Sequence, residues 1–242
     1  MSVFELSMWA TVAALFISVL FLLGMLMAGS EVDVPEVDIP INWDETTSHG
    51  EFVAPKYKEK QLCVIDTETT GLYAGTHELI ELCIIPVDDK LNRIGYPFHV
   101  QIKALFPERA HPKALKINGL DPTEGVSAQA ARELLTKQMD DAGIKKFIPI
   151  AQNWEFDRSF LKEFLGRNFE KRFHYRAEDT QRLAAGINRA HIIATGTPLF
   201  KSTSLKNLAN TFCIDYSGAH RAERDCEITL DVYRKLCSFI RA

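Results

Sequence analysis

The first 49 residues of this 242-residue chain contain no lysine and no arginine, although they contain seven acidic residues. All 28 basic side chains therefore lie in residues 50–242, and the net charge of −4 conceals a slightly basic C-terminal part. An acidic chain argues against a polyanionic partner, whereas a slightly basic domain does not. The charge balance thus leaves nucleic acid open as a ligand.

The five cysteines lack the paired spacing of a zinc site, and their number is odd. Cys63 and Cys83 lie in apolar runs, which is typical of reduced, buried thiols and predicts a reducing compartment. The chain also lacks the G-x-S-x-G turn of serine hydrolases and the G-x-x-x-x-G-K-[ST] loop of nucleotide hydrolases. These absences argue against both enzyme classes.

One long apolar run is present near the N-terminus. Residues 8–29 carry no charge, and their polar interruptions are Thr11 and Ser18. A helix needs about 20 apolar residues to cross a bilayer, so this run predicts a single transmembrane helix. A cleaved signal peptide is the alternative, but such peptides have a basic start and a shorter apolar core.

The sequence divides into three parts. We expect a membrane anchor at residues 1–29, an acidic linker containing proline at residues 30–59, and a catalytic domain at residues 60–242. Because of the cysteine usage, we expect a membrane-anchored protein whose catalytic domain faces the cytoplasm. The absence of basic flanks leaves the orientation unset by charge.

The third part alternates between strand and helix patterns. Short apolar runs with β-branched residues predict strands, and apolar residues at helical spacing predict helices. The expected strands are 62–66, 78–87, 95–102 and 147–151, and the expected helices are 128–142, 157–165, 177–187, 205–212 and 222–240. We expect the first three strands to form an antiparallel run. Ser204 is the expected N-cap of the helix at 205–212. This order predicts an α/β fold with a mixed central sheet flanked by helices.

Three segments place acidic residues at the ends of these elements. Asp66 and Glu68 end the first strand, where residues two apart point to one face, an arrangement that favours a cation between them. Asp157 follows the strand at 147–151, and His220 precedes Asp225 at the start of the last helix. Each segment alone is equally explained by solvated acids, helix caps or a surface histidine.

Together the segments read D-x-E-T-T-G, N-x-x-F-D and H-x-A-x-x-D. This order resembles the DEDDh family of 3′–5′ exonucleases, which includes ribonuclease T and the proofreading subunit of bacterial DNA polymerase III. The segment 111–120, the Asp179-Thr180 pair and the Ser204-Leu205 pair also resemble that family. The resemblance covers residues 60–242 and implies a ribonuclease H-like fold.

The resemblance implies a two-metal hydrolysis. Two Mg²⁺ ions, with Mn²⁺ able to substitute, would be held by the four carboxylates, which are the hard oxygen donors that Mg²⁺ prefers. The implied metal ligands are Asp66, Glu68, Asp157 and Asp225, and the implied general base is His220. The expected substrate-binding residues are Thr67, Thr70, Gly71, Leu72, Asn153 and Phe156.

The expected substrate is the 3′ end of single-stranded nucleic acid, with DNA favoured over RNA. Contacts to the 2′ hydroxyl would separate the two, and the sequence does not specify them. We also expect no polymerase-binding tail, because the chain stops just after the last predicted helix. The alternative function is a catalytically silent, membrane-tethered nucleic-acid-binding module on the same fold.

Overall fold

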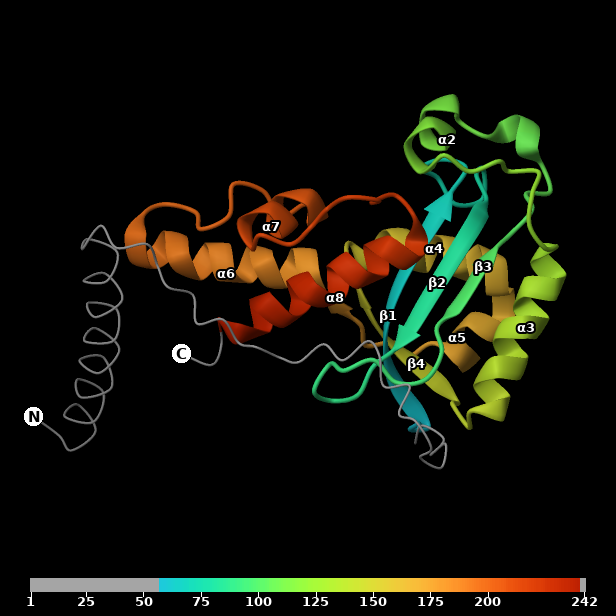
Figure 1. Ribbon diagram of the computed structural model, residues 1–242, viewed down its shortest axis with the longest axis horizontal. Coiled ribbons are helices and arrows are strands. Elements are labelled where there is room, and N and C mark those ends of the chain that lie inside the picture. The colour runs from blue at the N-terminus through green and yellow to red at the C-terminus, as the bar shows by residue number, and fades with distance from the viewer. Residues whose placement is uncertain (1–56, 240–242) are drawn as a thin grey trace, which may run out of the picture. The chain divides into compact units, whose positions relative to one another are not determined.

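The computed structural model describes residues 57–239, which contain one five-stranded sheet and its covering helices (Figure 1). The strands are β1 (Lys60–Thr69), β2 (Leu79–Pro86), β3 (Phe98–Gln101), β4 (Lys146–Ala151) and β5 (Glu178–Asp179). The α-helices are α2 (Pro112–Asn118), α3 (Ala128–Asp141), α4 (Trp154–Leu165), α5 (Phe169–Arg172), α6 (Thr180–Thr195), α7 (Leu205–Thr211) and α8 (Ala222–Ser238). Two short 3₁₀ turns are η1 (Pro107–Arg109) and η2 (Gly166–Asn168).

The sheet is mixed, with strand order β3-β2-β1-β4-β5. β2 pairs antiparallel with both β1 and β3, whereas β4 pairs parallel with β1 and β5. The antiparallel run of three strands and the mixed sheet are therefore confirmed. Because β1 and β4 are parallel, their carboxyl ends meet at the same edge of the sheet.

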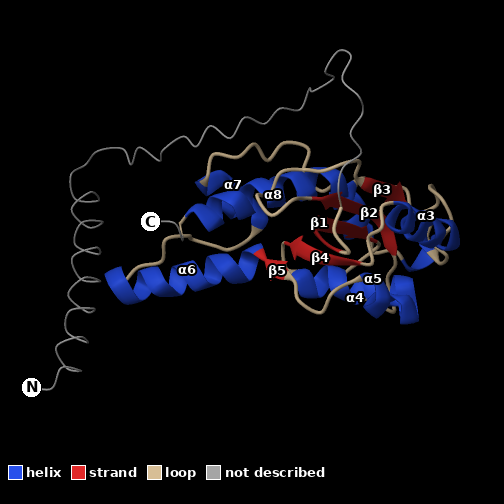
Figure 2. Cartoon of the chain, turned by 90° about the horizontal axis from the view of Figure 1, so that it is seen from below, coloured by secondary structure: helices blue, strands red, loops and turns tan. Residues whose placement is uncertain are grey.

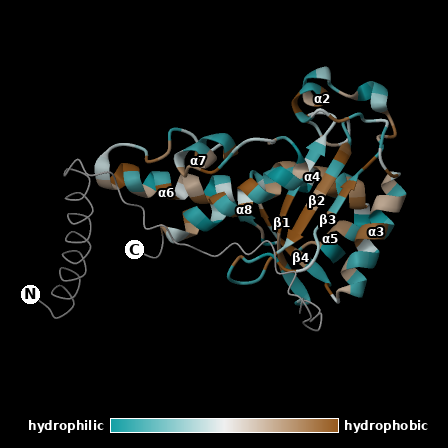
Figure 3. Ribbon diagram, in the orientation of Figure 1, coloured by the Kyte–Doolittle hydropathy of each residue, from teal (hydrophilic) through white to brown (hydrophobic). Residues whose placement is uncertain are grey.

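Alternation along the central strands builds two cores. Cys63 and Ile65 of β1 face a cluster that includes Leu135 of α3 and Leu161 of α4. Val64, between them, faces the opposite cluster with residues of α8. Figure 2 accordingly shows α4 and α8 on opposite sides of the sheet, and Figure 3 shows apolar strands between helices that are largely hydrophilic outside. Burial on both faces explains why β1 and β2 read as continuous apolar runs.

Helices α6, α7 and α8 share a third core, whose buried members include Phe200, Leu208 and Val232. Ser204 caps α7 as predicted, since its side chain accepts a hydrogen bond from the Asn207 amide. Helix α6 begins three residues later than predicted because Asp179 is its N-cap and accepts from the Arg182 amide. Helix α2 was not predicted, and strand β5 was indicated only by the resemblance of Glu178-Asp179-Thr180 to a strand end of the family.

The membrane part of the predicted fold class and location is contradicted. Within residues 57–239 no helix is long and apolar enough to cross a bilayer: the two longest, α8 and α6, have 17 and 16 residues. A bilayer requires about 20 apolar residues, and both helices carry charged residues. The run predicted as the anchor, residues 8–29, lies outside the described residues. The membrane-anchored assignment is therefore withdrawn.

Gly125 marks a tight crossing of the chain near the end of β3. Its φ is +104°, and a Cβ built there would lie 2.4 Å from the backbone oxygen of Gln101. The amide of Val126 donates to that same oxygen at 3.0 Å, so the two backbones cannot separate without losing the bond. Gly125 therefore allows the segment that leads into α3 to lie close against the end of β3.

Replacing Gly125 with alanine is expected to lower the free energy of unfolding by ~3 kcal/mol, because strain and a backbone clash add. For a chain of this size the corresponding fall in Tm is about 6–12 °C in a thermal melt. Gly143→Ala is the matched control, since Gly143 has φ +68° and open space at its Cβ position. It should lose only ~1 kcal/mol. Equal losses in the two variants would contradict the role given to the Gln101 contact.

Candidate active site

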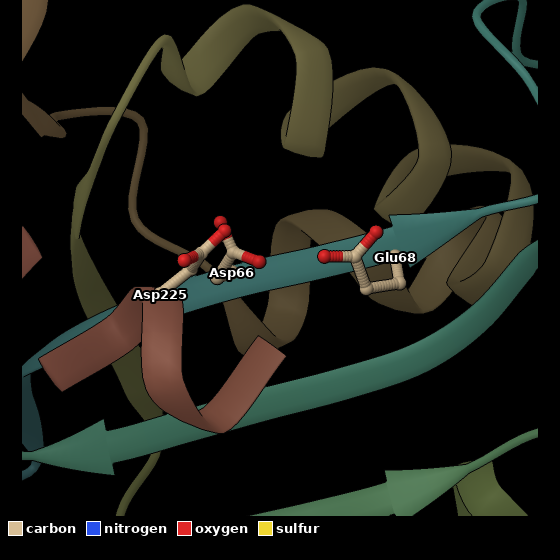
Figure 4. Close-up of side chains that lie close together, drawn as sticks. All are labelled: Asp66, Glu68 and Asp225. Atoms are coloured by element: carbon tan, nitrogen blue, oxygen red, sulfur yellow. The ribbon is translucent and has the colours of Figure 1, made fainter. Parts of the chain in front are cut away.

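Three carboxylates from two distant parts of the chain meet at the carboxyl end of β1. One carboxylate oxygen from each of Asp66, Glu68 and Asp225 lies within 4.8 Å of the others. Figure 4 shows the three side chains converging, two from β1 and one from α8. Asp66 and Glu68 are half-buried and Asp225 is buried. The structure thus brings together three of the four predicted metal ligands.

Local structure explains this convergence. Asp66 and Glu68 are two residues apart on β1 and so point to the same face of the sheet. Asp225 lies in the first turn of α8, whose buried residues Cys226 and Leu230 pack against β1 and β2. The N-terminus of that helix favours negative charge. The helix thereby sets its acid beside the strand end.

Asp157, the fourth predicted ligand, lies outside this three-residue group. It is buried in α4, and its Oδ1 accepts a hydrogen bond from the Thr67 hydroxyl at 2.7 Å. Thr67, predicted to bind substrate, is itself buried and uses its side chain to orient Asp157. Asp157 nevertheless lies close enough to Asp66 to act on it electrostatically.

All four acids have raised pKa values. Burial, followed by the charges of Asp157, Asp225 and Glu68, raises the pKa of Asp66 well above its ordinary value. Burial likewise raises the pKa of Glu68 to about 8 and that of Asp157 to about 7. The pKa of Asp225 is also raised, chiefly by burial. Crowded carboxylates of this kind are stabilised when a cation neutralises them.

The donors fit a hard divalent cation. Oδ1 of Asp225 is buried and has no hydrogen-bond partner, so one acceptor of the group is unsatisfied by the protein. Carboxylate oxygens suit Mg²⁺ or Mn²⁺, whereas thiols do not. The three buried cysteines, Cys63, Cys83 and Cys226, contribute no atom to the group.

His220 lies on the loop before α8, as predicted. Its side chain is exposed, and its ring packs edge-on against Tyr216 at a centroid distance of 6.3 Å. Its backbone amide donates to Oδ2 of Asp225 at 3.3 Å. The backbone is in the left-handed region, with φ +71°. The imidazole is thus exposed beside the carboxylate group.

The residues after β1 form a turn next to the carboxylates. Thr70 is buried, and its hydroxyl accepts from the Glu78 amide at 2.8 Å. Gly71 faces the His77 ring so closely that a Cβ would lie 2.2 Å from it. Leu72 is 72% exposed, which leaves its side chain free to contact a ligand. Thr70 and Gly71 therefore shape the turn, and Leu72 projects from it.

The two remaining predicted substrate residues lie at the start of α4. Asn153 is an exposed N-cap residue with φ +64°, and its backbone amide donates to Oδ1 of Asp179 at 3.4 Å. Phe156 is half-buried, and its ring lies 5.0 Å from that of Phe160. Both occupy the turn that precedes Asp157.

Sequence reasoning missed Asn118, at the end of α2. It is buried, donates to the backbone oxygen of Thr69 at 3.2 Å and hydrogen-bonds the Glu68 carboxylate. The segment 111–120 resembles the family, but no local signal links its asparagine to a strand 49 residues earlier. The contact exists only once α2 lies over the end of β1.

Comparison with known proteins places this geometry in a family. The sequence model described as "Exonuclease" matches residues 63–233. Ribonuclease T of Haemophilus ducreyi is 30% identical over 206 residues, covering 78% of this chain and 90% of the relative. Ribonuclease T of Shewanella denitrificans is 27% identical over 183 residues, covering 70% and 77%.

Solved structures agree on the fold. E. coli exonuclease I in complex with a dT13 oligonucleotide superposes with a TM-score of 0.60 at 19% sequence identity. The match covers 73% of this chain but 41% of exonuclease I, so the chain spans less than half of that protein. The ribonuclease H-like sheet and the order of its acidic motifs agree with the family match. The chain belongs to the DEDDh family of 3′–5′ exonucleases.

Proposed function

We propose that the chain removes nucleotides from the 3′ end of single-stranded nucleic acid by metal-dependent hydrolysis. The observation that carries the proposal is the convergence of Asp66, Glu68 and Asp225 within 4.8 Å. We include Asp157 as the fourth ligand because its charge acts on Asp66. Residues 60–242 form the exonuclease domain in this proposal, which the family match over residues 63–233 supports.

Each residue has a distinct task in this proposal. Two bound Mg²⁺ ions, or Mn²⁺ in their place, would supply an activated water and neutralise the charge on the leaving 3′ oxygen. The four carboxylates would hold the cations, and Thr67 orients Asp157 through its hydroxyl. His220, exposed beside Asp225, takes the proton from the attacking water as general base.

The turn after β1 receives the terminal nucleotide. Leu72 projects from it and offers an apolar contact to a base, while Thr70 and Gly71 fix the backbone beneath. Asn153 and Phe156, in the turn before Asp157, complete the proposed nucleotide site. A base unstacked from its neighbours can make such a contact, which favours single strands.

DNA is the favoured substrate and RNA the second candidate. Exonuclease I has been crystallised with a dT13 oligonucleotide, whereas the sequence relatives are named ribonuclease T. Both nucleic acids therefore belong in the test.

The test offers the purified full chain single-stranded DNA and RNA of one sequence, labelled at either end, with Mg²⁺. We expect a label at the 3′ end to be released at once as a mononucleotide. A strand labelled at the 5′ end should shorten stepwise. Chelation should stop both reactions, and Mn²⁺ should restore them. The Asp66→Asn variant, purified identically, measures contaminating nuclease. Internal cleavage, or activity that survives chelation, would contradict the proposal.

A further inference from the structure

We propose that Glu81 of β2 is a positioning residue that holds His220 in its catalytic place. The inference rests on the proposed role of His220 as general base. Glu81 belongs to none of the sequence motifs and is not a member of the carboxylate group. It acts through Arg221 and Ala222, the two residues that follow His220 in the chain.

Glu81 is a buried carboxylate with unusually many partners. Its side chain is 0% exposed. Arg221 donates from Nη2 to Oε1 at 2.7 Å and from Nε to both oxygens at 3.2 Å. The Ala222 amide donates to Oε2 at 2.9 Å, and Nε2 of His99 lies 2.9 Å from Oε1. Because a carboxylate only accepts, the His99 nitrogen is the donor.

These bonds keep Glu81 ionised. Burial alone would raise the pKa of the Glu81 carboxyl, but the bonds from Arg221, Ala222 and His99 outweigh burial and hold that pKa below its usual value. The neighbouring acid in the sheet register, Glu68, has the opposite shift. Two paired positions on β1 and β2 therefore have different roles. Glu68 belongs to the carboxylate group, whereas Glu81 forms hydrogen bonds with Arg221, Ala222 and His99.

His220 needs such support because its backbone is strained. A residue with a side chain at φ +71° costs about 1–3 kcal/mol and persists only where its surroundings impose it. On the preceding side, Arg224 donates to the backbone oxygens of Ser217 and Asp215 at 3.0 and 2.6 Å. On the following side, Glu81 binds Arg221 and Ala222. Together with the bond from the His220 amide to Asp225, these contacts fix the loop on both sides of His220, and Glu81 supplies those on the following side.

The effect of Glu81 falls on His220 more than on Asp225. Arg221 is the N-cap residue of α8, but its side chain does not cap the helix. The Glu81 carboxylate of β2 accepts a hydrogen bond from the first helical amide instead. Asp225 is carried by a helix that Cys226, Ile228 and Leu230 anchor in the core. The loop before the helix has no fully buried side chain, since Ile214, Tyr216 and Ala219 are only partly buried against the core, so loss of the Glu81 bonds frees the loop first.

The test replaces Glu81 with glutamine in the full chain. The variant keeps the shape but loses the charge that binds Arg221. We expect kcat on a single-stranded oligonucleotide to fall about 10- to 100-fold, the loss that a misplaced catalytic group produces. KM and the Mn²⁺ affinity measured by calorimetry should stay within about twofold, since neither depends on His220.

Two further variants separate positioning from a general structural role. Glu223→Gln removes the other carboxylate near His99, at 3.6 Å, and its surface position predicts a change of less than about twofold. Arg221→Lys keeps the charge but loses the forked geometry, so it should lower kcat like Glu81→Gln. If Glu81→Gln does not fold, Arg221→Lys still tests the inference. The Arg221 side chain is half-exposed, so replacing it disturbs the core less than replacing the buried Glu81.

A double-variant cycle decides the outcome. If Glu81 works through His220, adding Glu81→Gln to His220→Gly should cost less than about a further twofold. A full additional loss in that background, or an unchanged kcat in both Glu81→Gln and Arg221→Lys, overturns the inference. An inactive wild-type chain, or His220→Gly at the wild-type rate, overturns the proposed function instead.

Discussion

The Asp66→Asn variant is expected to lose at least about 10³-fold in hydrolysis rate and yet to melt at a higher temperature than the metal-free wild type. The rate falls because several kcal/mol of transition-state stabilisation depend on the bound cations, and each 1.36 kcal/mol is about tenfold. The Tm at pH 8 rises because asparagine removes a charge that the structure crowds against Asp157, Asp225 and Glu68. We expect a gain of about 2–4 °C, equivalent to ~1 kcal/mol for a chain of this size.

The sign of the stability effect follows from proton binding. Asp66, Glu68 and Asp157 have raised pKa values in the folded state, the latter two at about 8 and about 7. Between their ordinary pKa values near 4 and these raised values, the folded chain binds more protons than the unfolded chain. Stability of the metal-free protein therefore falls as pH rises through this window. Asp66→Asn should flatten the fall.

The measurement compares thermal melts at pH 5 and pH 8, with chelator and with saturating Mn²⁺. Cation binding should raise the wild-type Tm at pH 8 and remove the advantage of the variant. Asp88→Asn is the matched control: hydrogen bonds from Asn92 and Lys90 outweigh burial and lower the pKa of the Asp88 carboxyl, so its loss should not stabilise the chain. A lower Tm for metal-free Asp66→Asn at pH 8 would contradict the crowded-carboxylate account.

The elements that the sequence predicted well are those with a local signal. The core strands alternate or run apolar, and the last helix repeats at helical spacing, so their positions agree with the structure to within a few residues. Ser204 and its helix were found because a cap acts within three residues. The local pattern does not predict the short strand β5, because its two residues gain regularity only by pairing with β4.

The carboxylates were found by a different route. Each acid alone is an ordinary surface or cap residue, and only their order at the ends of elements indicated a shared site. The structure then added what spacing cannot contain: Thr67 turns inward to Asp157, and Asn118 reaches Glu68 from across the fold. The role of Glu81 could not be predicted because this residue lies inside an apolar strand and two of its partners, Arg221 and Ala222, lie 140 and 141 residues later.

Replacing His220 with glycine is expected to lower kcat by about 10²- to 10⁴-fold, the usual contribution of a general base. Glycine is the informative choice because His220 has φ +71°, a region that glycine adopts without strain. The variant should therefore melt at the wild-type temperature or slightly above it. Mn²⁺ affinity should be kept, because the carboxylates are untouched and the residue 220 amide can still donate to Asp225.

Cys213→Gly provides the matched control. Cys213 is also exposed and also has a positive φ, +55°, so the backbone gains the same relief without the loss of an imidazole. Its hydrolysis rate should equal that of the wild type. Of the two glycine variants, only His220→Gly should regain part of its rate when imidazole is added, because the vacated space lies beside Asp225. If instead both glycine variants lose activity together, backbone rigidity of the region and not the imidazole would limit the reaction. If His220→Gly alone keeps full rate, a different group must take the proton, and the exposed ring beside the carboxylates would have no part in the hydrolysis.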